Sequence, residues 1–123
     1  MKNVSTIIII IMTVFLFNCT NFSDTEYSTE DTKVFLTITP NTTKSELKKI
    51  SEEFKQKRNI DIDYSKSIFF DNGKIKNLNL KVNTNDGYSG EGNCSSAGLK
   101  MKKFGFSRDY SKEAKQNFHI GAL

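Results

Sequence analysis

Apolar and polar residues alternate in several short runs between residues 33 and 83. In the first run, "KVFLTIT", Val34, Leu36 and Ile38 fall on one side, and this period of two is typical of a β-strand. The runs "IDIDYSKSIFF" and "IKNLNLKVN" alternate in the same way. Their apolar faces would hold Ile60, Ile62 and Tyr64 in the first case, and Leu78, Leu80 and Val82 in the second. The pattern therefore predicts three strands, separated by a segment of different periodicity.

That segment, "NTTKSELKKISEEFKQKRN", has the period of an α-helix. Leu47, Ile50 and Phe54 recur at positions i, i+3 and i+7, which gives one apolar stripe. Thr43 is followed three residues later by Glu46, the arrangement of a capping box, in which each side chain accepts a hydrogen bond from a free backbone N–H group. We therefore expect a helix that begins just after Thr43.

Two turn signals divide the rest of this region. "DNGK", at residues 71–74, predicts a type I′ hairpin, because Asn-Gly accepts the positive φ angles that this turn requires. A second signal at residues 85–87 leads to a short strand near Tyr88. The order strand, helix, strand, strand indicates the α+β class, with one helix packed on a small antiparallel β-α-β-β sheet and a further C-terminal strand and short helix left open.

Residues 38–82 also resemble a known small domain. The shared features are Thr42-Thr43 before the helix, Glu46-Leu47, the spacing through Ile60, Ile62 and Tyr64, and Gly73-Lys74-Ile75 in the hairpin. The stretch is similar to a βαββ domain of Bacteroidota envelope proteins, found at the C-terminal end of M56/BlaR1-type sensor proteins and in short lipoproteins. The sensors carry a zinc peptidase with a His-Glu-x-x-His motif. This chain has no such motif, so the resemblance implies a fold and not a peptidase activity.

The N-terminal segment has the composition of an export signal. A positive residue, Lys2, precedes an apolar run from Val4 to Phe17, and the chain becomes polar after Cys19. The run suits a signal peptide, whose apolar region has about 7–15 residues, better than a membrane span, which needs about 20. "LFNC" resembles the bacterial lipobox through Leu16 and Cys19, which implies diacylation of Cys19. We therefore expect a signal peptide of the lipoprotein type at 1–18, a lipidated Cys19 with a flexible tether at 19–32, and the α+β domain at 33–123.

Two alternatives stay open at this segment: an ordinary cleaved signal that leaves Cys19 as a thiol, or an uncleaved anchor. If Cys19 is acylated, Cys94 has no partner within the chain, whereas a Cys19–Cys94 disulfide would require the lipobox interpretation to be wrong. Thr20 stands where an Asp would signal retention in the inner membrane. By that resemblance, we expect a protein anchored in the outer membrane and facing the periplasm.

Charge and composition exclude some classes of partner. The chain has 123 residues and a net charge of +4, which is only mildly basic for a nucleic-acid binder. "KKFGFSRD" is similar to the RNA-recognition signature at Phe104, Gly105 and Phe106, but it departs from that signature at Lys103 and Asp109. An exported protein meets little RNA, so we expect no nucleic-acid partner.

The candidates for catalysis are weak. His119 is the single histidine and Cys94 is isolated, so we expect no metal site, no nucleophilic triad and no cofactor. Asp61 and Asp63 share one face of a strand, where they would be solvated. "GYSGEGNCSSAG" begins like a phosphate-binding G-x-G-x-x-G loop but lacks the third glycine, and a mobile loop is the favoured interpretation. The sequence therefore predicts a protein without enzyme activity.

The tail after residue 98 has two interpretations. In one, Leu99, Met101, Phe104 and Phe106 form an edge strand with a bulge, and "RDYSKEAKQNF" forms a short helix. In the other, basic and aromatic side chains form a surface that docks on an anionic head group or on an acidic partner protein. The residues of that candidate surface are Lys102, Lys103, Phe104, Phe106 and Arg108.

The function expected from the sequence follows from location and from the lack of catalytic groups. It is a lipid-anchored envelope protein whose α+β domain is a non-catalytic interaction module for another envelope protein. The alternative is a periplasmic inhibitor or immunity-type protein that binds and blocks an effector enzyme.

Overall fold

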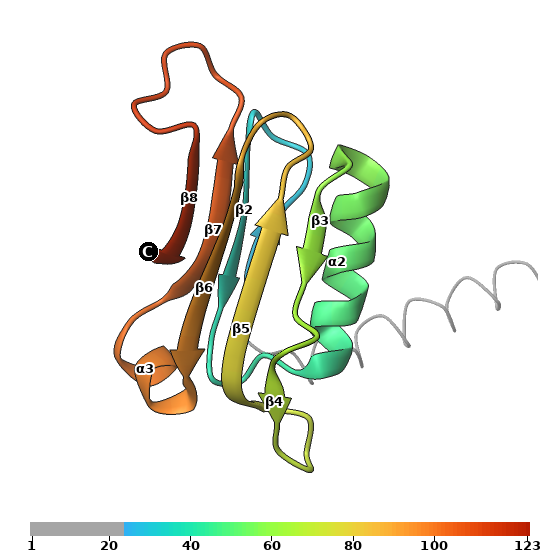
Figure 1. Cartoon of the computed structure of the whole chain (residues 1–123), viewed down its shortest axis with the longest axis vertical. Helices are drawn as coiled ribbons and strands as arrows, with labels where there is room; N and C mark the ends of the chain where they lie inside the picture. The colour runs from blue at the N-terminus through green and yellow to red at the C-terminus, as the bar shows by residue number, and fades with distance from the viewer. Residues whose placement is uncertain (1–23) are drawn as a thin grey trace, which may run out of the picture.

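The computed structural model describes residues 24–123, and the predicted signal peptide and the lipidation of Cys19 lie outside this part. The described chain contains eight strands and two helices (Figure 1). In chain order they are β1 (Glu26–Ser28), β2 (Lys33–Ile38), α2 (Lys44–Arg58), β3 (Asp61–Asp63), β4 (Ile68–Phe69), β5 (Ile75–Asn83), β6 (Ser89–Ser95), α3 (Ser96–Met101), β7 (Phe104–Asp109) and β8 (Phe118–Ala122). The predicted α+β class is confirmed, and β2, α2, β3 and β5 follow the expected β-α-β-β order.

The strands form two antiparallel sheets rather than the single sheet expected. One has the order β1-β2-β7-β8, and in the other β3 and β4 pair with one edge of β5 while β6 pairs with the opposite edge. Figure 1 shows the sheets facing each other, and β6 lies close to β8. Residues of both sheets and of α2 share one core cluster. One 15-residue helix covers too little apolar surface for all these strands, so the two sheets also bury each other.

Helix α2 is formed as its sequence predicts. Thr43 is the N-cap, and its hydroxyl accepts from the Glu46 N–H while the Glu46 carboxylate accepts from the Thr43 N–H. The stripe of Leu47, Ile50 and Phe54 is buried. The helix ends at Asn59, whose φ of 53° is the left-handed conformation typical of a helix C-terminus. Local signals therefore set both the start and the buried face of α2.

The glycine-rich segment is a strand and not a mobile loop. Residues 89–95 form β6, in which Gly90, Gly92 and Cys94 lie opposite the buried residues of β5. A Cβ atom added at Gly92 would lie 2.7 Å from Cζ of Phe104 in the other sheet. A Cβ atom added at Gly90 would lie equally close, 2.7 Å from Cγ2 of Ile120. The glycines are there because the two sheets approach closely at this point.

The ordered domain begins earlier than residue 33. Residues 26–28 pair with β2 as strand β1, although the sequence placed them in a flexible tether. Two contacts hold the chain just before β1: the Thr39 hydroxyl donates to the Asp24 carboxylate, and the hydroxyls of Thr25 and Thr42 are hydrogen-bonded. A polar composition predicted a tether here, but the free edge of β2 offers a partner for these backbone groups.

The C-terminal region also differs from expectation. Strand β7 is an inner strand between β2 and β8, not an edge strand. The short helix is α3, before β7, whereas residues 110–117 contain no helix. The Asp109 carboxylate accepts from the Ser111 N–H, and the Asn117 amide donates to the Asp109 and Ser111 carbonyls. These side-chain bonds stabilise a turn and compete with a helix.

The predicted type I′ turn at residues 71–74 is wrong in type, although the hairpin exists. Positive φ occurs at Gly73 (87°) but not at Asn72. The Gly73 N–H donates to the Phe70 carbonyl at 2.9 Å, and the Phe70 N–H donates to the Lys74 carbonyl at 2.8 Å. One left-handed glycine is therefore enough to return the chain from β4 into β5.

Candidate functional site

A groove runs between α2 and the strand pair β3–β4. Its first part has a volume of about 520 Å³ and its second part about 460 Å³. The first part is lined by Ser51, Glu52, Lys55, Gln56, Ile60, Asp61, Ile62 and Asp63. The second is lined by Lys44, Ile62, Asp63, Tyr64, Ser65, Ser67 and Phe69. Ile62 and Asp63 belong to both parts, so they form one continuous depression, which we call the α2–β3 groove.

The floor of the α2–β3 groove is the edge of a sheet. Strands β3 and β4 pair with β5 on one side, and no other described strand pairs with them. Ser67 bridges the interruption between them: its hydroxyl accepts from the Asn79 N–H at 2.8 Å and donates to the Asn79 carbonyl at 3.1 Å. A side chain thus replaces the missing backbone pairing. The edge consists of two short stretches, 61–63 and 68–69, separated by a turn in which the Ser67 N–H donates to the Tyr64 carbonyl at 2.9 Å.

The three residues of β3 and Ile60 just before it, four consecutive residues, line the groove. Successive side chains of a strand point to opposite faces, so a groove that touches all four meets the backbone edge as well as one side-chain face. The other wall is polar and belongs to α2, where Ser51, Glu52, Lys55 and Gln56 lie on one side of the helix. A segment in the groove would therefore meet strand backbone on one side and polar helix side chains on the other.

The two carboxylates of β3 are engaged in local contacts. Asp61 accepts from the Lys55 ammonium at 2.8 Å and from the Asn85 amide at 2.9 Å, and these bonds lower the pKa of Asp61 below its ordinary value. Hydrogen bonds from the hydroxyl and the N–H of Ser65 lower the pKa of Asp63 in the same direction. General acid–base chemistry with two carboxyls needs pKa values that are pushed apart. Here both move downward, which favours charge recognition over proton transfer.

The second part of the groove is more apolar. The rings of Tyr64 and Phe69 meet edge to face, with centroids 6.4 Å apart, and both residues pack against the core while keeping part of their surface exposed. The Lys44 ammonium lies 5.6 Å from the centroid of Phe69. This arrangement leaves an aromatic recess bordered by one positive charge, which suits an apolar side chain with a neighbouring acid or carbonyl group.

The partner surface considered from the sequence is not assembled. Phe104, Phe106 and Arg108 lie on the inner face of β7, with 6%, 0% and 8% of their surface exposed. Phe106 packs on Phe54 of α2, with ring centroids 5.2 Å apart. Lys102 and Lys103 precede β7 and are exposed. The two lysines thus remain available to a partner, whereas the two phenylalanines belong to the core.

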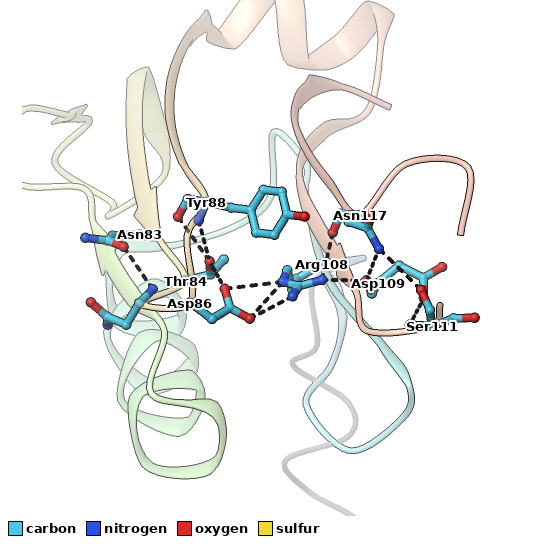
Figure 2. A network of polar contacts seen from close by, with 9 residues as sticks. Asn83, Thr84, Asp86, Tyr88, Arg108, Asp109, Ser111 and Asn117 are labelled. Atoms are coloured by element: carbon cyan, nitrogen blue, oxygen red, sulfur yellow. Dashed lines mark hydrogen bonds and ion pairs between the residues drawn. The ribbon is translucent and has the colours of Figure 1, made fainter. Parts of the chain in front are cut away.

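Arg108 has a structural role instead. Its guanidinium donates to the Asp86 carboxylate at 2.7 Å (Nη2) and to the Asn117 carbonyl at 3.3 Å (Figure 2). The Tyr88 and Tyr110 rings lie 4.6 and 4.4 Å from the guanidinium carbon. The hydrogen bond from Arg108 lowers the pKa of Asp86. One side chain therefore joins the β5–β6 turn of one sheet to β7 and the following loop of the other.

The remaining candidates offer little chemistry. Burial raises the pKa of the Cys94 thiol, and the sulfur lies 3.5 Å from the Ser95 carbonyl. Nε2 of His119 lies 2.8 Å from the Ala122 carbonyl oxygen. Within residues 24–123, no group of three or more His, Cys, Asp or Glu side chains could hold a metal ion. In the same part of the chain, no helix is long and apolar enough to cross a membrane.

Sequence reasoning missed the α2–β3 groove because the residues of its helix wall lie outside the apolar stripe of α2, and polar helix residues usually face solvent. The available signal was the run Ser65-Lys66-Ser67, which interrupts the apolar alternation after Tyr64. Such an interruption in an edge strand leaves backbone groups that a side chain or a partner must satisfy.

Comparisons of the chain with protein-family models, with curated proteins and with solved structures find no match.

Proposed function

We propose that this chain is a lipid-anchored envelope protein whose α+β domain is a non-catalytic interaction module. In this proposal, the α2–β3 groove binds an extended segment of another envelope protein, which adds as a strand to the β3–β4 edge. The observation that carries the proposal is the unpaired edge lying in a groove beside a helix.

The dimensions of the groove suit such a ligand. An extended chain rises about 3.3 Å per residue, so the three residues of β3 span about 10 Å, enough to pair with a short peptide strand, and β4 adds two residues beyond the turn at 64–67. Backbone hydrogen bonds to the edge would provide affinity, and alternate side chains would enter the recess at Tyr64 and Phe69. The helix wall would limit the groove to a single strand, which opposes open-ended sheet growth.

The anchor is inferred from the sequence alone. The apolar run that ends at Cys19 and the resemblance of "LFNC" to a lipobox support export and acylation. Two or more acyl chains hold a protein on a membrane stably, whereas a single chain binds weakly. Mass spectrometry of the native protein tests this directly: an N-terminal peptide that starts at an acylated Cys19 is expected, and an intact Met1 would contradict it.

A photo-crosslinking side chain placed in the groove tests the interaction. The probe replaces Gln56, which is exposed and lines the groove, and a matched probe replaces Gln116, which is exposed in the loop between β7 and β8. In intact cells, we expect an adduct of defined mass from the Gln56 probe and none from the Gln116 probe. Equal adducts from both positions, or none from Gln56, would contradict a role for the groove.

The identity of the crosslinked protein separates the two functional classes. A resident envelope protein supports the interaction module. A secreted effector enzyme, together with sensitivity of a deletion strain to that effector, would support the inhibitor or immunity-type alternative.

A further inference from the structure

One end of the domain carries an excess of lysines. It consists of residues 24–25, the β2–α2 connection with the start of α2 (39–46), the β4–β5 turn (70–74) and α3 with the residues after it (96–103). Figure 1 shows the start of α2, the β4–β5 turn and α3 at the same, lower end. We call this the basic end. Its charged residues are Lys44, Lys74, Lys100, Lys102 and Lys103, against Asp24, Glu46 and Asp71.

Specific contacts join these segments. The Lys44 N–H donates to the Gly73 carbonyl at 2.9 Å, and Nζ of Lys74 lies 3.4 Å from the Asn41 amide oxygen. Two of the three carboxylates already have protein partners, because Glu46 caps α2 and Asp24 accepts from Thr39. Hydrogen bonds from neutral donors leave these carboxylates charged, so the five exposed lysines against three carboxylates give this end a net charge of +2.

The opposite end differs in charge. It consists of residues 29–32, 57–59, 84–88 and 108–117, where five carboxylates meet five cations. Several of those groups are paired with each other, as in the contact of Arg108 with Asp86 and that of Lys57 with Glu30. The opposite end is therefore neutral, whereas the basic end has five lysines against three carboxylates.

Exposed apolar side chains gather at the same end. Ile68 in β4, Phe70 at the turn that follows and Met101 at the end of α3 are 53%, 46% and 83% exposed. Lysines beside exposed Phe, Ile and Met side chains form the composition that binds at the interface of an anionic membrane, where the charges meet head groups and the apolar side chains enter the acyl boundary.

The chain also enters the described domain at the basic end. Asp24 is held by Thr39, and its pKa is lowered chiefly by that hydrogen bond, with a smaller contribution from the charge of Lys103. Cys19 precedes Asp24 by five residues, which can span at most about 18 Å at about 3.6 Å per residue. Because residues 24–32 belong to the fold, a lipid on Cys19 would hold this end within reach of the head groups.

We propose that the basic end docks on the anionic lipid head groups of the membrane that holds the anchor, with Phe70 and Met101 at the interface. This inference rests on the proposed lipidation of Cys19. Helix α2 begins at the basic end and ends at the opposite one, so the Lys44 end of the α2–β3 groove would lie nearest the head groups, and the part lined by Lys55 and Gln56 would lie away from the membrane and stay open to a partner.

Single tryptophans can report this orientation, because the chain has no tryptophan of its own. Two variants of the full chain, Phe70→Trp and Tyr88→Trp, are purified from the membrane fraction. Each is then reconstituted in vesicles of phosphatidylethanolamine and phosphatidylglycerol with brominated acyl chains. Tyr88 is the matched control, since it is a 37% exposed aromatic residue at the opposite end. We expect several-fold stronger quenching of the indole in Phe70→Trp than of that in Tyr88→Trp.

Charge dependence is tested on the same reporter. Adding Lys74→Glu, Lys102→Glu and Lys103→Glu to Phe70→Trp should reduce the quenching to the level of Tyr88→Trp while the protein still floats with the vesicles. Quenching that is equally strong in vesicles of phosphatidylcholine alone would overturn recognition of anionic lipid.

The outcomes separate this inference from the proposed function. If the full chain floats with the vesicles but the two indoles are quenched equally, docking of the basic end is overturned and the anchor stands. If the full chain does not float, the anchor fails and the docking fails with it.

Discussion

Replacing Asp86 by Asn should destabilise the protein more than a typical surface substitution. Asp86 accepts from Nη2 of Arg108 at 2.7 Å and from Nε at 3.1 Å. Without the carboxylate charge, the Arg108 guanidinium would have only neutral hydrogen-bond acceptors, although the Arg108 side chain is only 10% exposed. Removing one partner of a fully buried ion pair costs about 3–5 kcal/mol. The Asp86 side chain is 37% exposed, so water can partly replace it, and we expect a loss of about 2–3 kcal/mol.

A double substitution tests the physical reason for this loss. When both charges are removed, in Asp86→Asn with Arg108→Met, no buried charge is left without a partner. The long apolar side chain at 108 can still pack between the rings of Tyr88 and Tyr110. The double variant should therefore lose less free energy of unfolding than the sum of the single variants, by about 1–3 kcal/mol.

Urea unfolding followed by far-UV circular dichroism measures these differences. The pH gives a second readout. Because the folded pKa of Asp86 is lowered from 3.8, its contribution is fully present above about pH 4 and is lost as the pH falls through the folded pKa. The difference in stability between the original chain and Asp86→Asn should therefore shrink below pH 4.

The refuting result is additivity of the two substitutions to within about 0.5 kcal/mol. Asp71→Asn, in the exposed β4–β5 turn, is the control and should change stability by less than about 0.5 kcal/mol.

Three further predictions concern the fold. In Gly92→Ala, the new methyl group would press on the Phe104 ring, so we expect a loss of about 1–3 kcal/mol in urea unfolding; an unchanged midpoint would mean that β6 is not packed tightly on β7. Thr43→Ala should cost about 1 kcal/mol through loss of the helix cap, and Thr43→Ser should restore most of it. Ser67→Ala removes both side-chain bonds to the Asn79 backbone, so hydrogen exchange measured by NMR should speed up at the Asn79 amide; unaltered protection there would contradict the bridge between β3 and β4.

The amino-acid sequence by itself determines the elements whose signals are local. Helix α2 follows from a capping box and an apolar stripe within one 15-residue segment, and both are present as predicted. Strands β2 and β5 follow from their alternation, because the apolar side chains on one face have no stable place except a core. The α+β class follows from the order of these elements.

The tertiary structure alone decided what depends on contacts between distant segments. The glycines of β6 carry no strand propensity, and their reason lies in the other sheet: the Phe104 ring, 12 residues beyond Gly92, and the Ile120 side chain, which lies against Gly90. Strand β1 forms because its backbone can pair with the free edge of β2, although the composition of β1 is that of a flexible tether. For the same reason, the sequence could not show whether the Phe and Arg side chains of β7 belong to the core or to a binding surface, since both residue types occur in both places. Whether a side chain is buried depends on the segment that packs against it as well as on the residue itself. That segment is fixed only in the folded protein, where the two sheets pack face to face.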